Sequence, residues 1–517
     1  MTSVIERCLN LLLPPILALG LAGSVNAEEQ NIGAPRLIAA TANWTEALRS
    51  LDDYDALGNP AAMPLRPVRL GEPREAPPAL RRLNAAMARW LPGIAQSAVP
   101  VLVPFDVGAL LRDLHDGKAP GPHLGRERYM SGFHRRVFFE AGPAGYDASF
   151  ALRAEGIEDL KDIAYSEPFQ IVLAGSRLLY DIGNQNVPQG RPVPDLDERF
   201  PGIRRAIHEH HLRYTFERFG VPYVASIVCF DGRRSRYRMP TCRDAERVMR
   251  RFLGALNLAG GTPRPAMRGE PVPPSRPARQ SATFTYEAPG ALLPSTGVRK
   301  HDGQPDRTAY SQIRFPLREA PAFVNSQLFQ KRNKPSEPGE QPNYTYPWRD
   351  SFCERRGFPV GQCPAGYGHQ GQDLRPALCE DGTATTCRPH DLVAVRDGVV
   401  MRWPGQEALY IIVNTGTEHL RFRYLHMDPR EMDARGLVSG RMLREGEVIG
   451  QMSNFSRRPA GTSYHLHFDI QVLTRHGWVF VNPYMTLVSS YERLIGGRGR
   501  QVADPELASE SRRAVNQ

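Results

Sequence analysis

The chain has 517 residues, including 46 Gly, 46 Pro and seven Cys, and carries a formal net charge of +10. This length exceeds that of one ordinary domain, so we expect at least two folded units. A hydrophobic content of 41% and an aromatic content of 9% exclude a wholly disordered chain. The positive charge is carried almost entirely by Arg and favours an anionic partner, but composition does not choose among nucleic acid, a membrane surface and a cell-wall polymer.

Residues 1–27 have the pattern of an export signal. An apolar run follows a single Arg7, and Val25 and Ala27 place small residues at the third and first positions before Glu28. The run is short and broken by proline, and no later segment reaches the roughly 18 apolar residues that span a bilayer. We therefore expect cleavage after Ala27 and an exported protein with no transmembrane anchor.

Six cysteines remain after removal of the signal. An even number in an exported chain favours disulfides over zinc binding, because no pair has the C-x-x-C spacing of a zinc ribbon. Neighbours in sequence suggest the local pairs Cys229–Cys242, Cys353–Cys363 and Cys379–Cys387, although other pairings stay open. Disulfides indicate an oxidising compartment, which we expect to be the periplasm, with secretion as the alternative.

The mature chain divides into regions of different composition and pattern. They are a mixed region (28–126), an α+β domain (127–261), a Pro/Arg-rich linker with a weakly patterned segment (262–345), a domain of short alternating strands (346–495) and a polar tail expected to be disordered (496–517). The fold class is therefore multidomain.

Helices and strands are expected in the first two regions. The expected helices are 79–90, 107–114, 203–219 and 244–256, and the expected strands are 137–139, 148–152, 169–182 and 222–230. A capping box at Thr241 begins the last helix. The run His208-Glu209-His210-His211 is not an H-E-x-x-H motif, so we assign it to a solvated helix face. No chemistry can be assigned to residues 127–261.

The charge is concentrated in the linker. Residues 262–334 hold twelve Lys and Arg against five Asp and Glu, whereas residues 346–494 hold seventeen against sixteen. The charge therefore gives no support to a nucleic-acid enzyme. Attraction of the linker to an anionic envelope polymer is one interpretation. The other is that the linker is a solvated spacer.

Three motifs in the C-terminal region carry chemistry. They are His369-x-x-x-Asp373, His426 at the end of a strand, and His465-Leu466-His467. Side chains on a strand alternate between faces, so His465 and His467 converge on one point, as a metal site needs. The same alternation predicts that His426 lies on the inward side of its strand with Phe422 and Tyr424. Each motif alone arises by chance, but three in order favour a metal site.

The residue types indicate the chemistry. Three ligands drawn from His nitrogen and Asp oxygen leave the fourth position of zinc open for water, which is typical of a catalytic site. Such a site suits amide hydrolysis, with the remaining histidines moving protons or stabilising the oxyanion.

With these motifs, residues 366–485 resemble the M23 family of zinc metallopeptidases, the lysostaphin- or LytM-type peptidoglycan endopeptidases. The match includes the strand 393–400, the segment Arg423-Tyr424-Leu425-His426 and Gly446-Glu447-Val448-Ile449-Gly450. The resemblance implies a mostly antiparallel β domain with one Zn²⁺ in a groove. It implies His369, Asp373 and His467 as zinc ligands and His465 and His426 as the catalytic pair.

This chain departs from the family at two places. A long insertion between Asp373 and Val393 contains Cys379 and Cys387, and two arginines, Arg457 and Arg458, precede the H-x-H motif. Neither departure removes an expected ligand.

The resemblance implies hydrolysis of peptide crosslinks in peptidoglycan. In a periplasm, the bond would be D-alanyl to diaminopimelate, a D,D-endopeptidase activity, and a glycine bridge is the alternative. Because some relatives have lost the metal, the non-enzyme alternative is a non-catalytic activator or wall-binding scaffold that regulates other hydrolases. Residues 282–345 could act as a latency segment over the groove.

Overall fold

The structure is a computed structural model that describes residues 31–51, 77–118, 128–183, 190–208, 210–231, 239–265, 271–292, 296–297, 306–326, 342–378 and 390–502. The expected signal peptide, the Cys379–Cys387 pair and the tail after residue 502 lie outside the described residues. Residues Ile32–Gln517 form one compact unit, so the expected division into separate domains is not confirmed. This unit contains two large hydrophobic cores.

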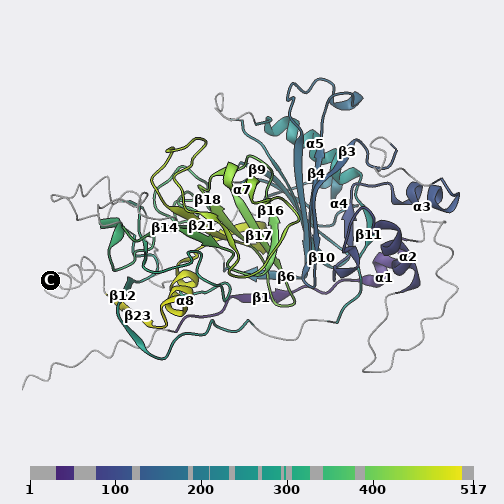
Figure 1. The fold of residues 1–517 in the computed structure, drawn as a ribbon. Helices are drawn as coiled ribbons and strands as arrows, with labels where there is room; N and C mark the ends of the chain where they lie inside the picture. Colours follow the sequence, from purple (N-terminus) through teal and green to yellow (C-terminus); the bar gives the residue numbers. More distant parts are fainter. Residues whose placement is uncertain are drawn as a thin grey trace, which may run out of the picture. The chain divides into compact units, whose positions relative to one another are not determined.

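The first core lies against a seven-stranded antiparallel sheet with the strand order β3-β4-β5-β10-β9-β8-β7 (Figure 1). Its strands are β3 (Phe133–Ala141), β4 (Gly145–Leu152), β5 (Phe169–Ser176), β7 (Arg191–Pro192), β8 (Arg204–His208), β9 (His211–Arg218) and β10 (Val221–Val228). Alternation is clear in β10, where Tyr223, Ala225 and Ile227 enter the first core and the intervening residues face the other side.

Short helices and a two-stranded sheet complete this half of the unit. They are α1 (Trp44–Arg49), α2 (Pro78–Met87), α3 (Val107–His115), α4 (Pro194–Asp197), α5 (Cys242–Gly254), the 3₁₀ helices η3 (Ile94–Gln96) and η4 (Glu158–Leu160), and the pair β2 (Val101–Val103) and β11 (Asn257–Gly260). The predicted helix cap is confirmed, because the Thr241 side chain accepts a hydrogen bond from the Asp244 N–H at the start of α5.

The predicted helix over 203–219 is wrong. These residues form the antiparallel hairpin β8–β9, which continues into β10. Leu212, Tyr214 and Phe216 recur at every second residue and all lie in the first core, which is a strand period. Phe219 and Gly220 both have positive φ angles and form the tight turn between β9 and β10. His208 ends β8 and His211 begins β9, so these residues of the histidine run lie on strands instead of on a helix face.

The second core is built on a sheet with the order β13-β14-β21-β18-β17-β16-β19, with β22 paired to β21 (Figure 1). Its strands are β13 (Ala322–Val324), β14 (Gln372–Pro376), β16 (Gly398–Met401), β17 (Leu409–Asn414), β18 (His419–Leu425), β19 (Met442–Leu443), β21 (Leu466–Thr474) and β22 (Gly477–Val481). Every pairing in this sheet is antiparallel, as the resemblance implies.

Smaller elements surround this sheet. They are β1 (Arg36–Ala39) paired with β6 (Leu178–Asp181), β15 (Asp391–Val393) with β20 (Val448–Gln451), β12 (Gln280–Glu287) with β23 (Arg498–Val502), the 3₁₀ helix η5 (Pro342–Tyr344), and the helices α7 (Pro429–Ala434) and α8 (Tyr484–Ile495). We expected strands up to Ile495, but α8 ends the region as a helix, and Leu487, Val488 and Tyr491 of its inner face enter the second core.

Parts of the expected linker and tail are structural. Phe284 of β12 and Phe315 lie in the second core, and the described start of the tail pairs as β23 with β12. Gly499 allows this approach, because a Cβ there would meet the Phe284 ring at 2.6 Å. Arg276 of the basic linker forms a two-pronged ion pair with buried Glu492. Attraction of the linker to an envelope polymer stays a prediction.

Two of the three predicted disulfides are present, Cys229–Cys242 and Cys353–Cys363. Such bonds are compatible with an exported protein. Among the described helices, none has the length and apolar character needed to cross a membrane.

Candidate metal centre

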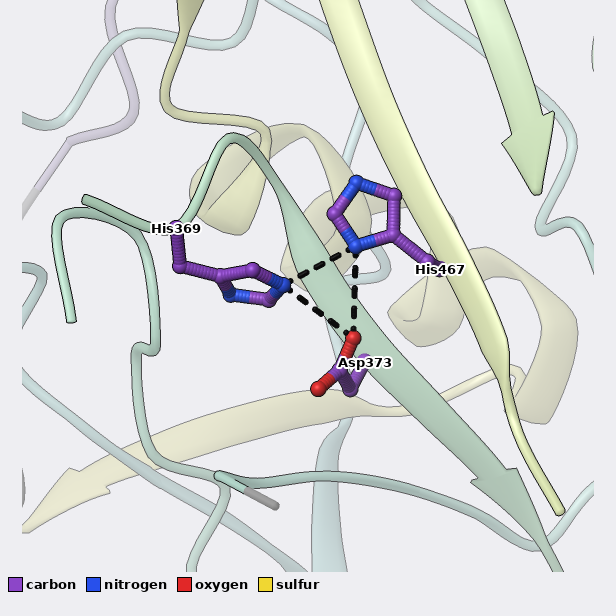
Figure 2. A group of neighbouring side chains, drawn as sticks. All are labelled: His369, Asp373 and His467. Atoms are coloured by element: carbon purple, nitrogen blue, oxygen red, sulfur yellow. Dashed lines mark hydrogen bonds and ion pairs between the residues drawn. The ribbon is translucent and has the colours of Figure 1, made fainter. Parts of the chain in front are cut away.

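The sheet of the second core, which contains β14, β18 and β21, is called the second sheet below. Its centre brings together residues that are far apart in the chain. Asp373 of β14 lies directly opposite His467 of β21, because the two strands pair antiparallel in that register. His369 lies in the loop that leads into β14. Figure 2 shows the three side chains pointing toward one another. Within the described chain, they are the one group of three or more His, Cys, Asp or Glu residues arranged to hold a metal ion.

The three donor atoms are close together. His369 Nε2 lies 3.2 Å from Asp373 Oδ1 and 2.9 Å from His467 Nδ1, and His467 Nδ1 lies 3.3 Å from the same carboxylate oxygen (Figure 2). All three residues are buried. Burial alone would raise the pKa of Asp373, but the neighbouring imidazoles of His369 and His465 lower it well below its usual range. The carboxylate is therefore ionised.

The other nitrogen of each imidazole has an acceptor outside the cluster. His369 Nδ1 lies 3.1 Å from the Ser351 carbonyl oxygen, and His467 Nε2 lies 3.2 Å from Asp469 Oδ2. Protons on these outer nitrogens leave His369 Nε2 and His467 Nδ1 as lone pairs that face each other and the Asp373 carboxylate. These donor atoms repel one another unless a cation lies among them. Without metal a proton can take this place, because burial would lower the pKa of His467 but its hydrogen bonds to Asp373 and Asp469 raise it. The donor set, two imidazole nitrogens and one carboxylate oxygen, fits zinc.

Residues outside the cluster hold this arrangement in place. Arg423 Nε donates to Asp469 Oδ2 at 2.6 Å, and its Nη2 donates to Gln370 Oε1 at 2.8 Å. Arg423 lies directly across from Asp469 in the pairing of β18 with β21. The guanidinium therefore fixes the carboxylate that orients His467.

Two further histidines lie beside the cluster. The rings of His426 and His465 are 4.9 Å apart, and His465 Nε2 lies 3.5 Å from Asp373 Oδ1. The Nδ1 atoms of His465 and His426 lie 2.7 and 2.9 Å from the backbone oxygens of Ser463 and Phe455. Burial lowers the pKa of His465 to about 3 and that of His426 to about 4. Both rings are therefore neutral at physiological pH.

The structure places His426 near His465 for a different reason from the one that we predicted. Phe422 and Tyr424 point into the second core, whereas Arg423 lies on the opposite face of β18 and contacts Asp469 beside the metal cluster. Strand β18 ends at Leu425, and His426 follows with a φ of 71°. This left-handed residue reverses the alternation and turns the imidazole toward the cluster. The parity argument was wrong for this residue.

Sequence reasoning missed the residues that orient the ligands. Asp469 shares the face of His467 at a spacing of two residues, so the strand pattern contained this signal. Arg423 was assigned to the wrong face of β18. Ser351 precedes His369 by eighteen residues of turns, and no local pattern could have identified it.

The structure describes one of the two departures from the family pattern in full and the other only in part. Arg457 and Arg458 are exposed, and the Arg457 backbone N–H donates to Glu407. The described start of the insertion after Asp373 continues β14, but Cys379 and Cys387 lie outside the described residues.

Comparison with known proteins gives little further information. No family model matches the chain, and no curated protein matches it. A solved structure from Ruminococcus gnavus, described as a candidate glycyl-glycine endopeptidase LytM, is similar at 17% sequence identity with a TM-score of 0.21. The match covers 36% of this chain and 62% of that chain. The chemistry of the centre therefore has to be inferred from its own residues and geometry.

Proposed function

We propose that the protein is a zinc-dependent endopeptidase that hydrolyses the peptide crosslinks of peptidoglycan. The observation that carries this proposal is the convergence of His369 Nε2, Asp373 Oδ1 and His467 Nδ1, with the outer nitrogens of both imidazoles beside acceptors. The M23 resemblance of the motifs supplies the substrate class. The D-alanyl–diaminopimelate bond is the proposed target, and the glycine bridge is the alternative.

Each residue has a role in this proposal. His369, Asp373 and His467 hold the zinc ion, which when bound would lower the pKa of a water molecule and polarise the scissile carbonyl. The Nδ1–H groups of His465 and His426 donate to backbone oxygens, so Nε2 of each ring carries a lone pair that can accept a proton from the attacking water. A ring that has gained a proton can then donate it to the leaving amine or stabilise the oxyanion.

The test compares His467→Ala with His476→Ala. His476 follows β21 at the turn into β22 and lies outside the metal cluster, so it is the matched control. We expect the wild-type protein and His476→Ala to bind one zinc ion per chain and to cleave purified sacculi. We expect His467→Ala to lose zinc and to lose activity by about 1000-fold or more.

Muropeptide analysis of the digested sacculi identifies the bond that is cleaved. Products with newly freed D-alanyl ends would support the D,D-endopeptidase assignment, and products with free glycine ends would support the alternative. A wild-type protein that binds no zinc and leaves sacculi intact would contradict the proposal and favour a non-catalytic activator.

A further inference from the structure

A cavity of about 610 Å³ lies between the seven-stranded sheet and the second sheet, next to the metal centre. At the end near the metal centre it is lined by Gln370, Arg423, Leu425 and Phe455. Gln370 follows His369 in the chain, and the backbone oxygen of Phe455 lies beside His426 Nδ1. Arg423 holds Asp469, and Leu425 lies across from His467. A ligand in this cavity would therefore reach the neighbours of the proposed catalytic residues.

One wall of the cavity comes from the seven-stranded sheet. Val172 of β5, Ser226 of β10 and Arg213 of β9 are consecutive partners across three paired strands, so their side chains share one face. The opposite face of the same strands enters the first core. This wall therefore belongs to the part of the chain to which the sequence assigned no chemistry.

Contacts between the two sheets fix this wall relative to the metal centre. Arg213 Nη1 donates to the Trp478 carbonyl oxygen at 2.6 Å, and Asp147 of β4 accepts from Arg421 of β18 and lies 2.8 Å from His419 Nε2. These ionic groups are buried. The cavity is therefore a fixed feature of the compact unit.

The lining is cationic and aromatic. Four arginines line the cavity, Arg213, Arg421, Arg423 and Arg457, against one carboxylate, Glu407, whose pKa is raised by burial. Five aromatic side chains accompany them: Trp403, Tyr410, Phe455, Trp478 and Phe480. The Arg421 guanidinium lies 3.9 Å from the centre of the Trp478 ring. Cationic and aromatic groups together are suited to an anionic ligand with an apolar body.

Three buried N–H groups of lining residues have no acceptor within the described part of the chain. They are Nε of Arg421 and Nε1 of Trp403 and Trp478. A buried donor without a partner costs free energy, but these three atoms have almost no accessible surface, so they make the lining more positive without bonding a ligand directly. The volume lies in the range of small-molecule and peptide sites and is too small for a nucleic-acid duplex.

We propose that this cavity binds a carboxylate-bearing peptide, and that the seven-stranded sheet thereby forms one wall of the substrate site. The second part of this inference rests on the proposed function, because it takes the bound peptide to be substrate. Arg421 and Arg423 already pair with Asp147 and Asp469, so the net positive charge of the lining favours the carboxylate, and the aromatic side chains pack against the peptide.

The test measures binding of acetyl-Ala-Glu-Ala and of the neutral acetyl-Ala-Gln-Ala-amide to the full chain by tryptophan fluorescence, with and without one equivalent of Zn²⁺. The wild-type protein is expected to bind the acidic peptide at least tenfold more tightly in both conditions. Ser226→Glu adds a carboxylate to the wall and is expected to abolish this preference. Ser166→Glu makes the same change at an exposed position outside the lining and is expected to leave the preference unchanged.

Gln170→Glu is a second variant at an exposed position of the lining, for use if Ser226→Glu does not fold. It is expected to reduce the preference at least threefold. Equal binding of the two peptides by the wild-type protein, or equal behaviour of the lining variants and Ser166→Glu, would overturn the inference. Zinc-dependent sacculus cleavage without charge preference would reject this inference alone. Charge preference in a protein that binds no zinc would reject the proposed function alone.

Discussion

Two buried carboxylates in this protein lie beside imidazoles, and their other partners differ. Asp147 lies where the two sheets meet, with His419 and the guanidinium of Arg421 as partners. Asp373 lies at the metal centre, with imidazoles around Oδ1 and no partner for Oδ2 among the described residues. The nearby guanidinium of Arg375 donates to the backbone oxygen of Asn325 instead.

This difference decides what each site can do. At Asp147, burial would raise the pKa, but the charges of Arg421 and His419 lower it to about 2, so the protein itself supplies the balancing cation. At Asp373 the partners are imidazoles, whose inner nitrogens can hold either a proton or a metal ion beside the carboxylate. The first arrangement stabilises the contact between the sheets, and the second suits a metal ion.

Asp147→Asn should have the largest effect on the stability of the metal-free protein. It leaves the buried charge of Arg421 without its partner, which costs about 3–5 kcal/mol in the free energy of unfolding. Urea denaturation measures the change. Asp181→Asn is the control, because its ion pair with Arg36 is exposed and is expected to contribute less than about 1 kcal/mol. Equal stability of both variants would show that Asp147 does not fasten the two sheets.

Asp373→Asn should have a smaller effect on the metal-free protein. The pKa of Asp373 lies well below its usual range, so the ionised carboxylate stabilises the fold, and we expect the variant to lose stability, but less than Asp147→Asn because its imidazole partners can release their protons. Zinc at about 100 times its Kd should stabilise the wild-type protein by about 2.7 kcal/mol and the variant by much less. Thermal unfolding with and without zinc gives both values. Equal stabilisation of the wild-type protein and the variant by zinc would mean that the metal binds at another site.

The strand motifs of the metal centre could be predicted because they depend on local geometry. His467 and Asp469 share a face through the two-residue period of a strand, and the apolar residues between them fill the second core. His426 could not be placed in this way, since one left-handed residue after β18 reverses the alternation. The position of this imidazole depends on a backbone angle that the sequence pattern does not encode.

The fold was harder to predict where local signals conflict. Residues 203–219 contain good helix formers, but the two-residue period of Leu212, Tyr214 and Phe216 wins because it fills the first core. The cavity wall was beyond prediction, because the residues that face Ser226 across the cavity, such as Met401 and Tyr410, lie far later in the chain. Such contacts between distant segments leave no periodic signal.

Glu140 extends the comparison to a third carboxylate, for which the described side chains provide no cationic partner. It accepts a hydrogen bond from the Asn414 side chain, and burial, followed by the charge of Asp147, raises its pKa to about 8. Its pKa in the unfolded chain is about 4.3, so between these values the folded protein binds a proton that the unfolded chain lacks. Stability from this group is therefore complete below about pH 4.3 and is lost as the pH rises toward 8.

Glu140→Gln should remove this dependence, because the neutral amide keeps an acceptor for Asn414 and carries no charge at any pH. We expect the variant to gain about 1–2 kcal/mol over the wild-type protein between pH 5 and pH 8, the smallest of the three effects. Urea denaturation at a series of pH values measures the gain, with the exposed Glu158→Gln as the matched control. Parallel pH curves for Glu140→Gln and wild type would mean that Glu140 is already ionised at the contact. In that case a proton would not neutralise Glu140 in the way that the Arg421 guanidinium neutralises Asp147 and that we propose for a metal ion at Asp373.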